Sequence, residues 1–159
     1  MAAPLRGNTG YSVYFITAST FQRRPLFHKE PMARLFAEVL FYYRDKQNYL
    51  LHEFLVMPDH FHLLLSPTLS LERSLQLIKG GFSYRAKREV EHSGEIWQPS
   101  YYDRRVREVE DYRNFKYYIR RNPVLRCLAE TPENYPFSSA HPGFVLDEIP
   151  ERLKLTLTA

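Results

Sequence analysis

Residues 57–65 read Met57-Pro58-Asp59-His60-Phe61-His62-Leu63-Leu64-Leu65, a turn dipeptide followed by two histidines around an aromatic residue and then an apolar run. Side chains alternate between the two faces of a β-strand, so His60 and His62 share a face with Leu64. Their backbones then lie roughly 6.6 Å apart, from about 3.3 Å of rise per residue, and both imidazoles can reach one divalent ion. On its own such a pair is more often structural or exposed than metal-bound, so the remaining ligand has to come from elsewhere in the chain.

The segments before this stretch predict two strands and a helix. Residues 49–57 are rich in apolar and aromatic residues and predict a strand, which Pro58-Asp59 would join to the histidine strand as a hairpin. Residues 11–20 predict a first strand. Between them, apolar residues at three- and four-residue spacing predict an amphipathic helix from Pro31 to about Gln47.

The segments after it predict two helices and a further strand. Ser70 is a favourable N-cap for a basic helix of about 20 residues. Gly80-Gly81 in the middle of that helix costs about 1 kcal/mol per glycine relative to alanine, which suggests a kink or the close approach of another backbone. Residues 100–107 alternate as a strand with arginines on both faces, near a sheet edge or a ligand groove. A third helix is expected over 109–121, stopped by Pro123.

The predicted order is strand, helix, strand, strand, helix, strand, helix. This order fits an α+β fold of the ferredoxin-like kind, an antiparallel sheet flanked by helices. We expect a single domain over residues 1–159, with loose or irregular ends at about 1–10 and 141–159.

Composition limits the class of protein. No run approaches the roughly 18 to 20 apolar residues of a membrane-spanning helix, and residues 1–7 lack the apolar core of a signal peptide. Cys127 is the single cysteine, so we expect no internal disulfide and a location in a reducing cytoplasm.

Positive charge is concentrated in the second half of the chain. Residues 73–126 contain 13 Lys or Arg against 7 Asp or Glu, whereas the rest contains 9 against 11, and 16 of the 22 basic residues are arginine. The arginine fork suits bidentate phosphate contacts, so a polyanion, nucleic acid first, is the expected partner. An ordinary basic solvated face is the alternative that charge alone leaves open. The candidate nucleic-acid contacts are Arg73, Lys79, Arg85, Arg104, Arg105, Arg107 and Arg121.

The third predicted helix supplies partners for the histidine pair. Tyr118 and Asn122 are four residues apart and therefore stand on one side of that helix. The Asn122 amide oxygen is a candidate third ligand beside His60 and His62, and hard ions such as Mg²⁺ or Mn²⁺ accept such a mixed set. Tyr118 would then lie beside a bound phosphate as a candidate nucleophile. The alternatives are that Tyr118 only packs the helix on the sheet and that Asn122 before Pro123 is an ordinary helix end.

These residues resemble a known family. His60-Phe61-His62 after Val56-Met57-Pro58-Asp59 is similar to the His-hydrophobe-His ("HUH") motif of single-tyrosine transposases. Three further segments resemble the branch called REP-associated tyrosine transposases: Trp97 with residues 100–107, residues 118–124, and residues 135–139. The resemblance spans roughly residues 11–140.

The resemblance implies a specific enzyme. In such enzymes the two histidines (here His60 and His62) and a polar residue one turn after the nucleophile (here Asn122) bind a divalent metal, and the tyrosine (here Tyr118) is the nucleophile. They nick single-stranded DNA, often near a hairpin or palindrome, and rejoin it through a 5′-phosphotyrosine intermediate. The REP-associated branch implies a monomer rather than a homodimer. The competing hypothesis is a non-catalytic module, such as a domesticated transposase, that binds single strands through basic and aromatic residues.

Overall fold

A four-stranded antiparallel sheet and three helices make up the chain, for which a computed structural model describes residues 11–154. The strands are β1 (Val13–Ser19), β2 (Tyr49–Met57), β3 (His60–Pro67) and β4 (Tyr102–Val106), and the helices are α1 (Glu30–Asp45), α2 (Leu71–Glu89) and α3 (Val109–Leu125). Short 3-10 turns lie at Phe21–Arg23, Leu26–His28, Pro132–Asn134 and Glu151–Leu153. The sheet order β2-β3-β1-β4 is that of the ferredoxin-like fold, so the predicted α+β class is confirmed, as is the edge position of the fourth strand.

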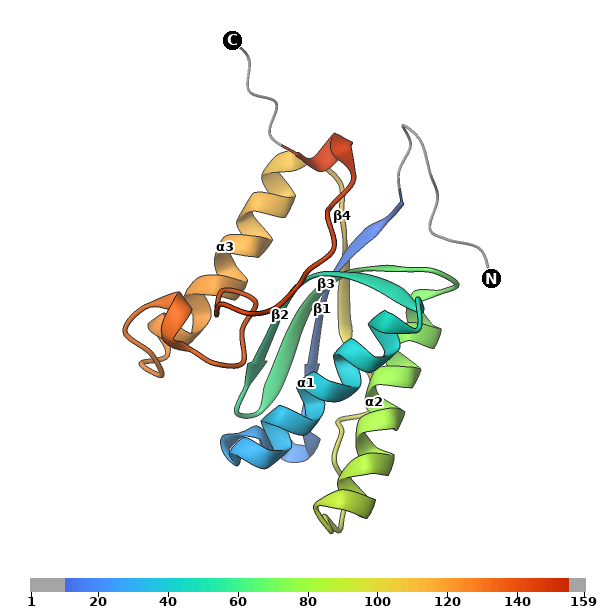
Figure 1. Ribbon diagram of the computed structural model, residues 1–159, viewed down its shortest axis with the longest axis vertical. Helices are drawn as coiled ribbons and strands as arrows, with labels where there is room; N and C mark the ends of the chain where they lie inside the picture. Colours follow the sequence, from blue (N-terminus) through green and yellow to red (C-terminus); the bar gives the residue numbers. More distant parts are fainter. Residues whose placement is uncertain (1–10, 155–159) are drawn as a thin grey trace.

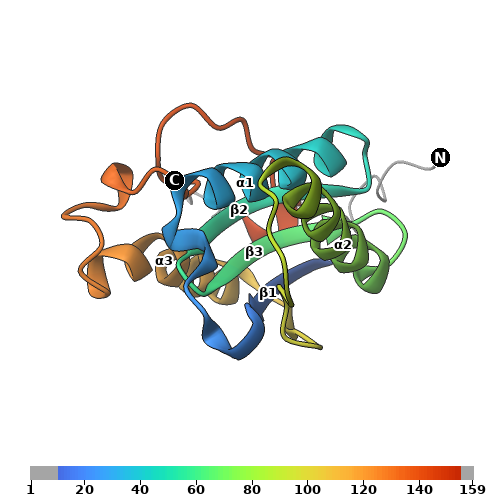
Figure 2. The same cartoon turned by 90° about the horizontal axis from the view of Figure 1, so that it is seen from below.

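The sheet separates two apolar cores. Helices cover both faces of the sheet (Figures 1 and 2). Helices α1 and α2 pack side by side over one face, where Phe61, Leu63 and Leu65 of β3 join a large aromatic and aliphatic cluster. Helix α3 covers the opposite face, where Leu64 joins Tyr112 and Ile119 of the helix. Because the histidines share a face with Leu64, they lie beneath α3.

The position of β3 inside the sheet explains its almost uninterrupted burial. It pairs with β2 on one side, with Leu55 opposite His62, and with β1 on the other, with Thr17 opposite His62. A strand buried on both faces and at both edges is apolar at nearly every position, and the two histidines are the polar exceptions over residues 60–65.

One of the two glycines of α2, Gly81, is explained by a neighbouring side chain, which corrects the expectation of a kink or a second backbone. Helix α2 runs unbroken from Leu71 to Glu89, with the Ser70 hydroxyl accepting a hydrogen bond from the Arg73 amide as predicted. A Cβ at Gly81 would lie 2.7 Å from Cε2 of Tyr43 on α1. Gly81 therefore makes room for the Tyr43 ring, whereas a Cβ at Gly80 would meet nothing within 4 Å.

The prediction that Pro123 stops the third helix is wrong. Pro123 is buried within α3, and the helix continues to Leu125. Proline removes only its own N–H from the helix ladder, and in the last turn the Arg126 and Leu128 amides still bond to the Asn122 and Pro123 carbonyls at 3.0 and 2.8 Å. Asn122 consequently keeps its helical position one turn after Tyr118.

The chain after α3 returns along the outer edge of β2. The Val56 amide donates to the Phe137 carbonyl, and the Ser139 amide donates to the Phe54 carbonyl, both at 2.9 Å. Further on, residues 141–154 are irregular apart from one 3-10 turn, but they are not loose, because Asp147 accepts hydrogen bonds from Arg44 at 2.9 and 3.0 Å. The expected loose arm at 1–10, and residues 155–159, lie outside the described part of the chain.

None of the helices described over residues 11–154 has the length and apolarity needed to cross a membrane.

Candidate active site

The two histidines of β3 lie side by side on the face that α3 covers. Their ring centroids are 4.8 Å apart with planes at 80°, and the residues are only 4% and 3% exposed. The alternation predicted from the sequence therefore brings both imidazoles together in a nearly dry position. The two rings are close enough to share one ligand.

Each imidazole is oriented by a partner on its Nδ1 atom. His60 Nδ1 lies 2.7 Å from the carboxylate of Asp59, and His62 Nδ1 lies 2.8 Å from the hydroxyl of Thr17 on β1. The Asp59 carboxylate can only accept, so His60 carries its proton on Nδ1 and its lone pair on Nε2. A carboxylate on the far nitrogen of a histidine is the usual second partner of a metal-binding imidazole.

Burial keeps both histidines neutral. It lowers the pKa of His62 to about 3, with a further lowering by the nearby His60. Burial also lowers the pKa of His60, although the hydrogen bond that His60 donates to Asp59 acts in the opposite direction. At neutral pH both rings therefore have a lone pair available for a metal ion.

Helix α3 places Asn122 and Tyr118 against the same histidine. The Asn122 amide nitrogen is 3.4 Å from His62 Nε2, and turning the amide over exchanges that nitrogen for the oxygen. The Tyr118 ring centroid is 5.3 Å from that of His62, with the planes at 77°. Asn122 is 4% exposed, whereas Tyr118 is 46% exposed, so the amide faces the buried end of the site and the phenol faces solvent.

The donor set fits a divalent metal ion. No three His, Cys, Asp or Glu side chains gather as a metal site within residues 11–154. A third protein ligand would thus have to be of another type, and the Asn122 amide is in contact with His62. Two neutral imidazoles and one amide oxygen would leave open positions on such an ion for substrate oxygens.

A buried ion pair fixes α3 to the sheet beside these residues. Glu53 of β2 is 3% exposed and accepts two hydrogen bonds from Arg120 of α3, at 2.9 and 3.2 Å. The same carboxylate accepts a hydrogen bond from the Ser139 hydroxyl at 2.7 Å. Arg120 lies between Tyr118 and Asn122 in sequence, so this pair sets the position of the helix that carries both.

Comparison with known proteins identifies the family. The chain matches the family described as "Transposase IS200 like" over residues 10–122. The protein belongs to the IS200-like transposase family.

The sequence of this transposase-family chain is similar to those of two curated relatives. A Haemophilus influenzae protein named as a REP-associated tyrosine transposase is 27% identical over 108 residues, which cover 60% of this chain and 61% of the relative. The REP-associated tyrosine transposase of Escherichia coli K12 is 28% identical over 97 residues, 57% of this chain and 54% of the relative. The chain thus matches about three fifths of the length of the first relative and about half of the length of the second.

Two solved structures share the fold of this transposase-family chain. A REP-associated tyrosine transposase bound to a REP hairpin superposes with a TM-score of 0.72 at 19% identity, covering 99% of this chain and 100% of the other. A transposase from Deinococcus radiodurans R1 superposes with a TM-score of 0.55 at 23% identity, covering 73% of this chain and 95% of the other. At these identities the likeness establishes the fold.

A hollow of about 450 Å³, which we call the aromatic hollow, lies beside His62. It is lined by Phe15, Thr17, His62 and Tyr102 from the sheet and by Asn114, Phe115 and Tyr118 from α3. Apart from His62, the sheet residues of the hollow have no local signal in the sequence, and neither do Asn114 and Phe115, because strand register brings the former together and the packing of α3 on the sheet adds the latter. Asp59 was detectable from its place next to His60 after a turn proline.

The candidate nucleic-acid contacts are spread over both faces of the sheet. Arg104 is exposed on β4 opposite Phe15, on the histidine face, whereas Arg105 is opposite Tyr14 and faces the other way. Arg107 is exposed just after β4, and Arg121 lies on α3 next to Asn122.

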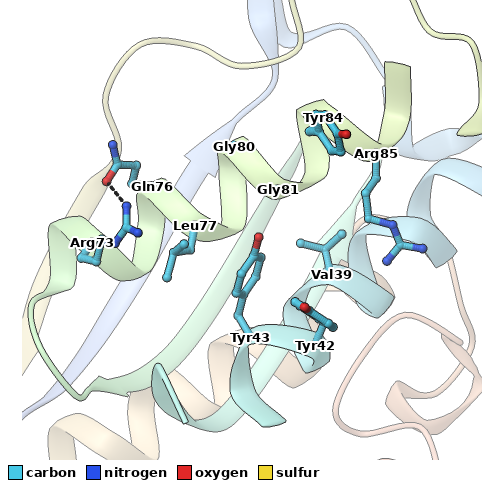
Figure 3. A pocket seen from close by; sticks show the side chains of 10 residues that line it. All are labelled: Val39, Tyr42, Tyr43, Arg73, Gln76, Leu77, Gly80, Gly81, Tyr84 and Arg85. Carbon is cyan, nitrogen blue, oxygen red and sulfur yellow. Dashed lines mark hydrogen bonds between the residues drawn. The ribbon is translucent and has the colours of Figure 1, made fainter. Parts of the chain in front are cut away.

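The candidate nucleic-acid contacts on α2 lie on the opposite side of the sheet from the histidines. Arg73 and Arg85 line a hollow of about 550 Å³ between α1 and α2, together with exposed tyrosines and the glycine pair (Figure 3). Arg85 already pairs with Glu89 at 2.5 Å. The Lys79 ammonium donates to the Gln98 and Ser100 carbonyls at 3.1 and 3.3 Å, which fastens the segment before β4.

Proposed function

We propose that this protein is a metal-dependent transposase that cuts and rejoins single-stranded DNA through a 5′-phosphotyrosine on Tyr118. The observation that carries the proposal is the arrangement around His62. The Asn122 amide lies 3.4 Å from its Nε2 atom, and the Tyr118 ring lies 5.3 Å from its ring, both from one side of α3. One chain thereby supplies a candidate metal site and an exposed phenol beside it.

His60, His62 and Asn122 would hold the ion, Mg²⁺ or Mn²⁺. When bound, the ion would neutralise charge on the scissile phosphate and make its phosphorus more electrophilic. Asp59 and Thr17 hold the two rings in the orientation that this requires, at 2.7 and 2.8 Å. Burial of the pair keeps protons from competing for the two Nε2 atoms near neutral pH.

Tyr118 performs the covalent step in this account. Its phenolic oxygen forms a bond to phosphorus, the bond from phosphorus to the 3′-oxygen breaks, the phenol proton passes to solvent, and the leaving oxygen takes up a proton. One phosphate ester replaces another, so a second 3′-hydroxyl can reverse the step and rejoin the strand without ATP. The 46% exposure of Tyr118 leaves the phenol reachable by a DNA backbone.

The substrate we propose is a single strand close to a hairpin or palindrome. Support comes from the family, from relatives named as REP-associated transposases, and from the similar fold that was solved with a REP hairpin. The arginines of β4 and α3 would contact phosphates. All four proposed site residues belong to one chain, which supports a monomer, and we place its action with the DNA in a prokaryotic cytoplasm.

A covalent-adduct assay tests the proposal. Full-length protein is incubated with Mn²⁺ and end-labelled single strands that contain hairpins, and adducts are separated in denaturing gels. We expect an adduct that is lost in Tyr118→Phe and in His60→Ala and kept in Tyr117→Phe, since Tyr117 is 66% exposed on the same helix and not part of the site. Binding without an adduct on any hairpin would instead identify a non-catalytic single-strand-binding module.

A further inference from the structure

The aromatic hollow has a floor and two walls made of rings. Phe15 of β1 stacks on Phe115 of α3 at a centroid distance of 4.3 Å. Tyr102 and Tyr118 both meet Phe15 edge-on, at 6.5 and 6.1 Å. A site of this volume lined by aromatic rings accepts a flat, mostly apolar group.

The two tyrosines are more exposed than a structural role requires. Tyr102 is 54% exposed and Tyr118 is 46% exposed, although Phe15 between them is 5% exposed. Pairs of open aromatic faces beside a buried ring provide surfaces on which bases of single-stranded nucleic acid stack. Tyr118 is the proposed nucleophile, whereas Tyr102 takes no part in the proposed reaction.

A polar group lies within reach of whatever fills the hollow. Asn114 precedes Tyr118 by four residues, so both side chains project from the same side of α3. Asn114 is exposed, and it lines the hollow. An amide offers a donor and an acceptor together, which is what recognition of a base edge needs.

A cation stands on the same face. Arg104 is two residues after Tyr102 on β4 and opposite Phe15, so it projects toward the face that carries the hollow. Arg104 is exposed. These groups match the parts of a nucleotide. The ring surface suits the face of the base, the exposed amide suits its hydrogen-bonding edge, and the arginine suits its phosphate.

We infer that the aromatic hollow binds the unpaired nucleobase immediately 3′ of the cut, with Tyr102 stacking on the base and Asn114 contacting its edge. This inference rests on the proposed function of the same site. In an in-line displacement the leaving 3′-oxygen lies opposite the attacking phenol. The 5′-phosphotyrosine therefore joins Tyr118 to the nucleotide that lies 3′ of the cut. Because Tyr118 also lines the hollow, the base of that nucleotide is the one nearest to it.

The hollow then has two effects on the reaction. Stacking retains the attached strand while the phosphotyrosine waits for a new 3′-hydroxyl. Contact with Asn114 favours one base at the first position of the attached strand. Tyr102 and Asn114 are thus specificity-determining residues, and the reacting groups stay those already described.

Sequencing of covalently attached strands tests the inference in the active protein. A single-stranded library with a randomised segment is incubated with full-length protein and Mn²⁺, adducts are isolated, and the first nucleotide joined to tyrosine is read. We expect one base to be enriched at that position, and the enrichment to disappear in Asn114→Ala. Unbiased attachment, or a bias that is the same in Asn114→Ala, would overturn the inference.

An abasic nucleotide measures the stacking contribution. On an oligonucleotide that forms the adduct, removing the base 3′ of the cut should slow adduct formation about 10-fold, within the range expected for one stacked base. Tyr102→Ala should show a similar loss with the intact oligonucleotide and little further loss with the abasic one, while Tyr102→Phe stays near wild type. Tyr84→Ala is the matched control, because Tyr84 is 60% exposed on the opposite side of the sheet. Equal abasic penalties in wild type and Tyr102→Ala would contradict the proposed stack.

Photocrosslinking separates this inference from the proposed function. Tyr118→Phe protein is irradiated with an oligothymidylate strand that carries 5-iodouracil, and the crosslinked peptide is mapped. A crosslink to Tyr102 or Phe115 supports the base site even if no adduct ever forms on any DNA. Crosslinks confined to tyrosines outside the hollow would refute the base site even if the nicking activity is present.

Discussion

Replacement of Arg120 by methionine should remove the counterion of the buried Glu53 carboxylate. Glu53 has a side chain that is 4% exposed, and two of its hydrogen bonds come from Arg120. Methionine keeps much of the side-chain volume but removes both donors, leaving the Ser139 hydroxyl as a partner at 2.7 Å. A buried charge without its counterion is the expected result.

The size of the loss follows from the burial of the two partners. Removing one partner of a buried pair costs about 3 to 5 kcal/mol. Arg120 has a side chain that is 34% exposed, so water can reach part of the vacated space, and the lower end, about 3 kcal/mol, applies. For a domain of this size that corresponds to a drop of about 6 to 12 °C in Tm.

Urea unfolding followed by circular dichroism provides the measurement, with a double-mutant cycle to isolate the pair. Glu53→Gln removes the charge and should cost less than Arg120→Met. The double variant should resemble Glu53→Gln alone, since methionine no longer faces a charge. Arg113→Met on the exposed side of α3 is the control and should stay within about 0.5 kcal/mol of wild type. Additive losses in the double variant, or a loss below about 1 kcal/mol in Arg120→Met, would refute the reasoning.

Three further outcomes are expected. Gly80→Ala should raise the free energy of urea unfolding by about 1 kcal/mol, whereas Gly81→Ala should lower it because its Cβ would press on Tyr43 at 2.7 Å; the reverse order would contradict the packing in Figure 3. Burial lowers the pKa of His52, so below about pH 6.5 this histidine becomes protonated in the unfolded chain before it does so in the folded one. The free energy of unfolding should therefore fall by up to about 1.4 kcal/mol per pH unit of acidification, less steeply in His52→Gln; parallel pH profiles would argue against this. Asp59→Ala should weaken Mn²⁺ binding about 10- to 100-fold in calorimetric titrations, since the first histidine loses its orienting carboxylate; unchanged affinity would remove it from the site.

Local patterns of the sequence predict most of the architecture. Alternation and a turn proline define the β2–β3 hairpin, and three- and four-residue apolar spacing defines α1, because these periods are properties of the backbone. The four-residue spacing of Tyr118 and Asn122 likewise predicts that they share a side of α3. In the structure both residues lie on that side of α3, next to His62.

Features that depend on tertiary contacts were out of reach of local patterns. Helix α3 continues through Pro123 with its later hydrogen bonds intact, where the rule for proline predicts an end. The Tyr43 ring, from another helix, accounts for Gly81. Glu53 pairs with a residue 67 positions away, and Thr17 meets its histidine through the strand register alone. No local pattern encodes such partners.

The most direct test of the central claim is to locate the nucleotide on the protein. Adducts formed with Mn²⁺ are digested with nuclease and trypsin, and the peptide over residues 117–120 is fragmented in a mass spectrometer. The account predicts a nucleotide mass on Tyr118, formed only with the divalent ion present. A nucleotide on Tyr117 or on any other residue, or the same yield in a chelator, would contradict it.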